Sequence, residues 1–193
     1  MEFRTNRLLL RPWHPDDADD VAAAYDIYRR WEVVRWLGAQ PKVWPDEPAT
    51  RERLTRWNAF AEANPGYGCW AVAVADASPS GRPVGTVLLM PLRDGNEVPT
   101  GHVEVGWHFH PDAWGQGYAT EASQALLEHA WALGLPEVEA IAFADNAASI
   151  KVMERLGMSY QGETDQWYGT TFTWYRIERP ASDAGAVSPT EGA

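Results

Sequence analysis

The segment that most constrains the fold is 102–122, in which a β-rich run leads through a glycine-bearing turn directly into a helix. Gly115 and Gly117 let the backbone turn tightly and come close to a ligand. The helix that follows presents unpaired N–H groups and the positive end of its dipole at the same place. The segment therefore indicates an anion-binding turn that needs no basic side chain, although such turns are also common as purely structural connections.

Patterns typical of strands and helices alternate on both sides of this turn. The predicted elements before it are a strand at 7–11, helices at 14–37 and 48–63, and a hairpin of strands 69–75 and 84–90 joined by the turn-forming cluster 76–83. The predicted elements after it are a helix at 120–133, a strand at 138–143, a helix at 146–156 and a last strand at 170–178. This order predicts a mixed α/β fold with antiparallel hairpins first and one strand–helix–strand crossover later.

The length and composition favour one domain with a short tail. With 193 residues, of which 45% are hydrophobic, the chain can bury one substantial core, which we assign to residues 1–179. Residues 180–193 contain no aromatic residue and only Val187 as a branched aliphatic one. Burial could not offset the entropy lost on ordering such a segment, so it is predicted to be a disordered tail.

Charge and hydropathy restrict the expected partners and location. The net charge of −11 comes from 27 acidic and 16 basic residues without a basic cluster, so direct binding of nucleic acid is not expected. A negative field would attract a cationic substrate, although it would equally serve solubility alone. No run approaches the roughly 18 apolar residues of a membrane span, and the N-terminus does not look like a signal peptide. We therefore expect a cytoplasmic protein with no membrane partner.

A second informative segment is 146–158, which has the pattern of an amphipathic helix. Asn146 can cap this helix, Ser149 lies in its first turn, and Gly157 can end it. Val152 and Met153 fall on its apolar face. Taken alone, the segment is fully explained as a structural helix.

The two segments together, however, resemble a known family. WGQGYATEA at 114–122 and NAASIKVMERLGM at 146–158 resemble motifs A and B of the Gcn5-related N-acetyltransferase (GNAT) superfamily, and TNRLLLRPWHPDDADDV at 5–21 resembles the start of its RimJ/RimL-like branch. The resemblance covers residues 4–178. It implies an α+β (mixed α/β) GNAT fold, with a central, mostly antiparallel, splayed sheet of about six or seven strands flanked by helices. It also implies acetyl-CoA as co-substrate, bound where two strands part, and no metal.

The resemblance assigns residues to the coenzyme. Backbone amides of the glycine turn would bind its pyrophosphate, and its pantetheine arm would lie along the strand before the turn. The implied coenzyme residues are Val105, Trp107, Phe109, Trp114, Gly115, Gln116, Gly117, Tyr118, Ala119, Thr120, Asn146 and Ser149. Trp114 stands where the family pattern opens with Arg or Gln, so we expect a change in coenzyme affinity without its loss.

Amide formation requires a neutral amine, which makes a base useful. Deprotonating a lysine-like amine at pH 7 costs about 4.6 kcal/mol, against about 1 kcal/mol for an α-amine. In the strand 102–110, His102, Glu104, His108 and His110 share one parity, so they should line one face. Glu104 is the predicted base, since the RimJ/RimL-like branch often has an acid in the matching E-x-G context. The alternative is an ordinary solvated carboxylate.

Two further chemical interpretations concern the proton donor and a metal. Many GNAT enzymes protonate the leaving thiolate with a tyrosine of the second motif, but Met153 holds that position here, which leaves Ser149 or water. The same four strand residues could alternatively chelate zinc, because His-x-His on a strand can do so. Cys69 is the only cysteine, so a cysteine-based zinc cluster is excluded and a buried thiol is expected.

The predicted function is transfer of an acetyl group from acetyl-CoA to a primary amine by direct attack in a ternary complex, and the alternative is a noncatalytic acyl-CoA-binding module. The acceptor is expected to be cationic, because the family's acceptor site would here be aromatic and acidic. The candidate acceptor residues are Trp31, Trp36, Glu104, Tyr168 and Trp174. A protein N-terminus, a polyamine, an aminoglycoside and an amino acid all remain open, as do a monomer and a homodimer.

Overall fold

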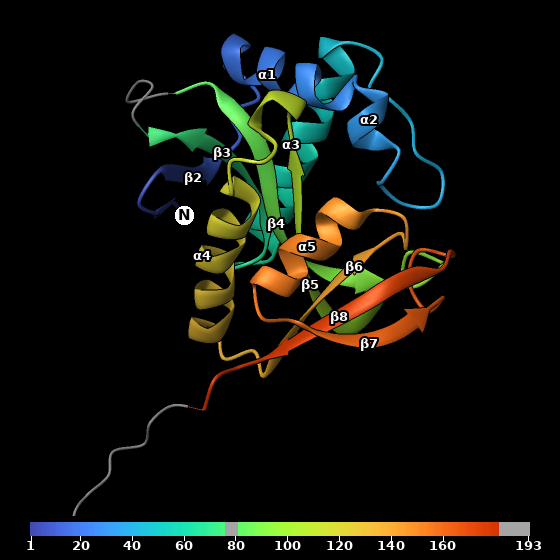
Figure 1. The fold of residues 1–193 in the computed structure, drawn as a ribbon. Helices are drawn as coiled ribbons and strands as arrows, with labels where there is room; N and C mark the ends of the chain where they lie inside the picture. The colour runs from blue at the N-terminus through green and yellow to red at the C-terminus, as the bar shows by residue number, and fades with distance from the viewer. Residues whose placement is uncertain (76–80, 182–193) are drawn as a thin grey trace, which may run out of the picture.

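The computed structural model describes residues 1–75 and 81–181. They form one eight-stranded sheet with helices on both faces (Figure 1). The predicted mixed α/β architecture is therefore confirmed. Residues 182–193 of the predicted tail and 76–80 of the predicted hairpin turn lie outside the described residues.

The sheet contains every strand that the sequence predicted and two more. In their order across the sheet, the strands are β1 (Phe3–Arg4), β2 (Leu8–Pro12), β3 (Gly68–Val74), β4 (Pro83–Arg93), β5 (Pro99–Phe109), β6 (Glu137–Ala142), β8 (Phe172–Glu178) and β7 (Ser159–Thr164). The neighbouring pairs are antiparallel apart from β5 with β6. The sequence missed the edge strands β1 and β7. In β7 the residues before Thr164 are exposed or half-exposed, so the alternation that marks a half-buried strand is missing.

The strands β5 and β6 separate toward their carboxyl ends. This pair is parallel, and its ladder is limited to Glu104 opposite Glu139. Beyond that point β5 continues to Phe109 alongside β4, while β6 continues to Ala142 alongside β8. The sheet is therefore splayed between β5 and β6, as predicted.

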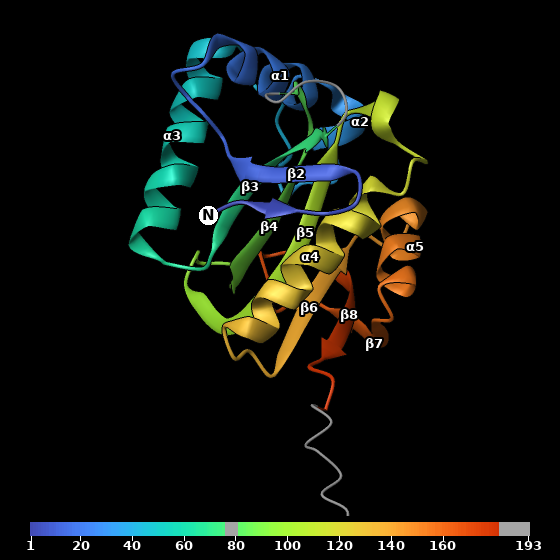
Figure 2. The same cartoon turned by 90° about the vertical axis from the view of Figure 1, so that its left-hand side faces the viewer.

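Two groups of helices cover opposite faces of the sheet (Figures 1 and 2). On one face lie α4 (Tyr118–Ala132) and α5 (Ala147–Arg155), whose buried side chains join those of β5 and β6 in one core. On the other face lie α1 (Ala18–Tyr28), α2 (Trp31–Val34) and α3 (Glu47–Ala63), which share a second core. Within residues 1–75 and 81–181, no helix is long and apolar enough to cross a membrane.

The single helix predicted over 14–37 is wrong, because the chain breaks it into α1 and α2. Asp17 caps α1 by accepting hydrogen bonds from the backbone N–H groups of the two residues Asp19 and Asp20. The backbone is extended at Arg30, where α2 begins. The last buried residue of α1 is Tyr28, and the next buried residues are Val33 and Val34. In the sequence, however, Ile27, Trp31 and Val34 keep the spacing of a continuing helical stripe, so the pattern contains no signal for the break.

The alternation predicted along β5 is confirmed. Val103, Val105 and Phe109 belong to the core beneath α4. Glu104 and His108 point to the opposite face, where they contact Tyr168 and Tyr28 of α1 respectively. One strand therefore presents an apolar surface to one side of the splay and titratable groups to the other.

Candidate active site

A cleft with a volume of about 1330 Å³ passes through the splay of the sheet. Residues 104–109 of β5 form part of its lining, together with Ile141 and Ala142 of β6. On the side of α4 and α5, it is lined by residues 113–121 and by one side of α5. On the opposite side it is lined by α2, residues 35–38, Tyr168 and Phe172. The cleft therefore connects the glycine turn with the polar face of β5.

The glycine turn has the backbone conformation that its glycines allow. Gly115 and Gly117 have φ values of 74° and 80°, in the left-handed region. Gly117 is the N-cap of α4 and has no side chain with which to cap it, so the first N–H groups of α4 stay free for a ligand. Trp114 fixes the start of the turn, since its indole Nε1 donates to the Phe109 carbonyl at 2.9 Å. The arrangement suits an anion at the end of α4.

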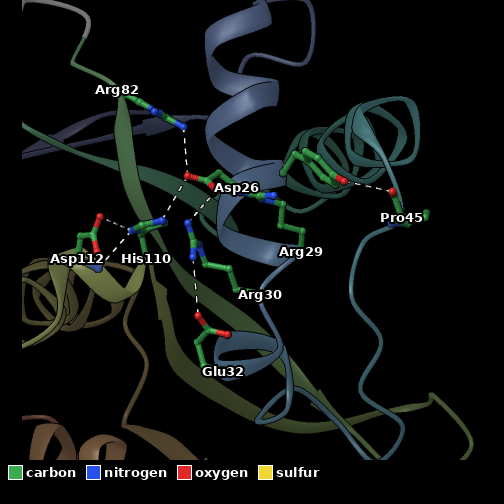
Figure 3. Close-up of polar contacts among 9 residues, drawn as sticks. Asp26, Arg29, Arg30, Glu32, Pro45, Arg82, His110 and Asp112 are labelled. Atoms are coloured by element: carbon green, nitrogen blue, oxygen red, sulfur yellow. Dashed lines mark hydrogen bonds and ion pairs between the residues drawn. The ribbon is translucent and has the colours of Figure 1, made fainter.

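A cluster of charges centred on Asp26 joins α1 to the chain that follows β5 (Figure 3). Asp26, near the end of α1, binds Arg29 at 2.8 Å and Arg30 at 3.1 Å. It also lies 3.3 Å from the Nε2 of His110, the residue that follows β5. Burial raises the pKa of Asp26, but the hydrogen bond from Arg29 and the charges of Arg30 and His110 hold it below its ordinary value. The junction between α1 and α2 is thereby tied to the chain just before the glycine turn.

One side of α5 faces the cleft with polar and basic groups. The Asn146 carboxamide oxygen accepts from the backbone N–H of Ser149 at 3.3 Å and so caps the helix. Asn146 and Ser149 both line the cleft. So do Lys151 and Arg155, which the sequence reasoning missed. Their spacing of four residues on one helix face, within an acidic chain, was the available signal.

Glu104 lies on the other side of the cleft with a perturbed carboxyl group. Its Oε1 accepts a 2.6 Å hydrogen bond from the Tyr168 hydroxyl. Burial raises the pKa of Glu104 to about 7, although the hydrogen bond from Tyr168 lowers it in part. At neutral pH the carboxyl group is therefore poised to accept or release a proton.

Tyr168 is held in a strained conformation beside Glu104. Its φ is 53°, which is uncommon for a residue other than glycine. Its backbone N–H donates to the Arg93 carbonyl at 2.9 Å. Burial and the charge of Glu104 raise the pKa of Tyr168, so its hydroxyl remains a hydrogen-bond donor. Strain of this kind persists where the surroundings fix it, commonly at functional sites.

The histidines of β5 have separate partners. The Nδ1 of His108 lies 3.0 Å from the hydroxyl of Tyr28, and burial lowers the pKa of His108 to about 4, so this ring is neutral at pH 7. The Nδ1 of His102 lies 2.8 Å from the Oε1 of Glu139. Glu104 contacts Tyr168, and His110 contacts Asp26. The four residues His102, Glu104, His108 and His110, which were considered as a zinc site, therefore do not converge. In the described part of the chain, the group with metal-ligand spacing is His102 with Glu137 and Glu139, where the Arg176 guanidinium lies 3.1 Å from Glu137.

The aromatic residues expected around the acceptor divide into two sets. Trp36 and Tyr168 line the cleft with Glu104, and the guanidinium of Arg35 lies 4.1 Å from the centre of the Trp36 ring. Trp31, which is 55% exposed, and Trp174, which packs against Trp167, are not among the cleft-lining residues. The residues that sequence reasoning missed on this side are Glu32, Arg35 and Phe172.

Residues 7–159 match the family described as the acetyltransferase (GNAT) domain. The chain belongs to the GNAT acetyltransferase family. The predicted enzyme class, an acetyl-CoA-dependent N-acetyltransferase, is thereby confirmed.

Sequence relatives agree with this family. The uncharacterized N-acetyltransferase YoaA of Bacillus subtilis (strain 168) is 24% identical over 169 residues, which span 86% of each chain. The FsC-acetyl coenzyme A-N(2)-transacetylase of Aspergillus fumigatus is 31% identical over 131 residues, which span 66% of this chain and 51% of that enzyme.

Solved structures share the GNAT fold. A GNAT-family acetyltransferase from Bacillus anthracis has a TM-score of 0.71 and 23% identity, over 92% of this chain and 98% of its own. RimL, a ribosomal L7/L12 alpha-N-protein acetyltransferase solved with coenzyme A, has a TM-score of 0.72 and 15% identity, over 92% of this chain and 98% of the RimL chain. The fold neighbours of this GNAT protein thus include enzymes of the RimL type.

Proposed function

We propose that this GNAT enzyme binds acetyl-CoA at the glycine turn and transfers the acetyl group directly to a primary amine held beside Glu104. The observation that carries the proposal is the single cleft that reaches both places through the splay between β5 and β6. A continuous cleft suits a ternary complex, in which both substrates are bound at once and no acetylated enzyme is needed.

The residues around the turn fit the coenzyme. The free N–H groups at the start of α4 and the cations of Lys151 and Arg155 suit its phosphates. Along β5, Val105, Trp107 and Phe109 offer an apolar surface to the pantetheine arm. When bound, acetyl-CoA supplies an activated thioester; the protein's own contribution is to orient it and to handle protons.

Glu104 is the base in this proposal. Its carboxylate accepts a proton from the acceptor's ammonium, directly or through a water, so that the nitrogen attacks in its neutral form. A pKa of about 7 leaves a large fraction of Glu104 ionised at neutral pH and able to hold the proton afterwards. Tyr168 positions this carboxylate by its hydrogen bond.

Ser149 is the proposed proton donor to the departing thiolate, with water as the alternative; its oxygen takes up in turn the proton that the attacking nitrogen loses as the amide forms. Its position in the first turn of α5 places it in the cleft lining, near the capping residue Asn146. Tyr168 is already committed to Glu104 and is therefore assigned to positioning.

A cationic amine is the proposed acceptor. Aromatic rings of Trp36, Tyr168 and Phe172 line the acceptor side of the cleft together with the carboxylates of Glu32 and Glu104. Rings and carboxylates both favour an ammonium group. A protein N-terminus and a small-molecule amine both satisfy this chemistry.

Acetyl-CoA should stabilise the protein against heat, because a ligand that binds the folded state shifts the folding equilibrium. At one hundred times Kd the gain is about 2.7 kcal/mol, or about 5–10 °C for a chain of this size. Thermal melts with and without millimolar acetyl-CoA measure it, and an unchanged Tm would contradict the coenzyme site. Release of free thiol with a panel of N-terminal peptides, polyamines and aminoglycosides would then identify the acceptor.

Replacing Tyr168 by phenylalanine should shift the pH dependence of turnover. The hydroxyl lowers the pKa of Glu104 by stabilising its charged form. Its loss raises that pKa, so the carboxylate forms only at higher pH. The acidic limb of the pH–rate profile therefore moves to higher pH. A hydrogen bond to a charged group contributes about 1.5–3 kcal/mol, which corresponds to about one to two pH units.

Tyr25→Phe is the matched control for Tyr168→Phe, because it removes a hydroxyl that donates to the Pro45 carbonyl outside the cleft. Its pH–rate profile should match that of the unmodified enzyme. A Tyr168→Phe profile that also stays in place would show that the tyrosine has no influence on the base.

A further inference from the structure

The amino end of α4 carries an acid where the proposed function needs an anion to bind. Glu121 lies in the first turn of this helix and lines the cleft beside the glycine turn. Burial raises the pKa of its carboxyl group, but hydrogen bonds from Thr5 and Arg7 and the charge of Arg7 lower it below the ordinary value, so Glu121 is ionised at neutral pH. Left alone, this charge would repel the phosphates of a coenzyme.

The amino-terminal segment of the chain surrounds this carboxylate with donors. The Thr5 hydroxyl and the Arg7 backbone N–H both donate to the Oε1 of Glu121, at 2.6 and 2.8 Å. The Nε and NH2 groups of the Arg7 guanidinium each lie 2.7 Å from its Oε2. This two-pronged contact places a full positive charge against the acid of α4.

The same guanidinium also contacts the turn itself. The NH1 group of Arg7 donates to the Gln116 carbonyl at 3.0 Å, and its Cζ lies 4.9 Å from the centre of the Tyr118 ring. A Cβ built on Gly117 would come within 3.4 Å of the NH2 group. Arg7 therefore lies directly behind the glycine turn, while Trp114 gives that turn no charge of its own.

We infer that Arg7 is a positioning residue for the coenzyme, which neutralises Glu121 and holds the turn from 116 to 118 in the conformation that presents its N–H groups. The inference rests on the proposed coenzyme site. It assigns to the residue just before β2 the positive charge that the turn lacks. Arg7 acts from behind the turn: its charge offsets that of Glu121, and its own contact with the Gln116 carbonyl holds the backbone.

Removing the charge at position 7, at position 121 or at both distinguishes this role from a purely structural one. Arg7→Ala leaves the charge of Glu121 unpaired, so the Kd for coenzyme A should rise about tenfold. Glu121→Gln in the otherwise unchanged protein leaves the cation of Arg7 uncompensated beside the turn, so the Kd should fall severalfold. The double variant should bind coenzyme A severalfold more tightly than Arg7→Ala alone. If the contact between Arg7 and Glu121 were only structural, Glu121→Gln and the double variant should both bind coenzyme A more weakly, because each loses further hydrogen bonds.

The experiment is calorimetric titration of the purified 193-residue protein and its variants with coenzyme A at low salt. Arg4→Ala is the matched control, since it removes a neighbouring positive charge on β1 and leaves the pair of Arg7 and Glu121 in place. It should bind as the unmodified protein does. Weaker binding by Glu121→Gln, or equal binding by Arg7→Ala and the unmodified protein, would overturn the inference. The Glu121→Gln result decides the question even where Arg7→Ala fails to fold.

Failure of the proposed function gives a different result. If the unmodified protein shows no heat of binding with coenzyme A, the coenzyme site itself is wrong. If it binds and the charge variants do not follow the predicted order, only the role of Arg7 is wrong.

Discussion

Replacing Glu104 by glutamine is expected to lower the turnover number about ten- to a thousandfold at pH 7, the usual range for loss of a general base. The amide keeps the size of the side chain and can still accept a hydrogen bond from Tyr168, but it cannot take a proton from an ammonium group. Coenzyme affinity should change little, because the proposed phosphate contacts lie at the start of α4. Initial rates with a lysine-like acceptor, together with the Kd for coenzyme A, measure the two effects separately.

Rising pH should restore part of the lost rate. Near the pKa of the amine, solvent already supplies the neutral nucleophile, so the deficit of Glu104→Gln shrinks. A carboxylate with a structural role would instead lower stability and activity together at every pH. Glu137→Gln serves as the control, since it changes a carboxylate outside the cleft on the neighbouring strand β6.

The acceptor has to be chosen with its basicity in mind. Deprotonating an α-amine at pH 7 costs only about 1 kcal/mol, against about 4.6 kcal/mol for a lysine-like amine. Near-normal turnover of a folded Glu104→Gln with a lysine-like acceptor at pH 7 would exclude the proposed base.

The sequence predicted the fold well where the signals were local. Alternation along β5 placed Glu104 and Val105 on opposite faces, and the glycines of the turn marked the start of α4. The break between α1 and α2 was missed because Ile27, Trp31 and Val34 continue the helical spacing of apolar residues across it. The strand β7 was missed because an edge strand with exposed side chains has no periodic signal.

The candidate site was predictable in its parts and less so in its contacts. Glu104 and Tyr168 were both candidates, but their hydrogen bond joins residues 64 positions apart and depends on the left-handed backbone of Tyr168. The contact of Arg7 with Glu121 spans 114 positions and has no local pattern at all. Pairing of this kind arises from the order of the strands and from the packing of α4, so it becomes visible only with the fold.

Gly117→Val is expected to weaken coenzyme binding about thirtyfold or more, which at one hundred times the Kd of the unmodified protein leaves about a third or less of the thermal shift caused by acetyl-CoA. The reason differs from simple blockage of the cleft, because the new Cβ would point toward the Arg7 guanidinium, 3.4 Å away. A β-branched residue is strongly disfavoured at a φ of 80°, so the turn should relax and move the first N–H groups of α4. Losing even one charge-assisted hydrogen bond costs about 1.5–3 kcal/mol.

Gly134→Val separates strain in the turn from strain in general. Gly134 follows α4, has a φ of 85°, and a Cβ there would meet no atom within 4 Å. Both variants should therefore lose Tm by similar amounts, because both force a β-branched residue into the left-handed region. Thermal melts with and without millimolar acetyl-CoA should show the full ligand-induced shift in Gly134→Val and a much smaller one in Gly117→Val. A full shift in Gly117→Val would mean that the turn is structural and that the coenzyme binds elsewhere.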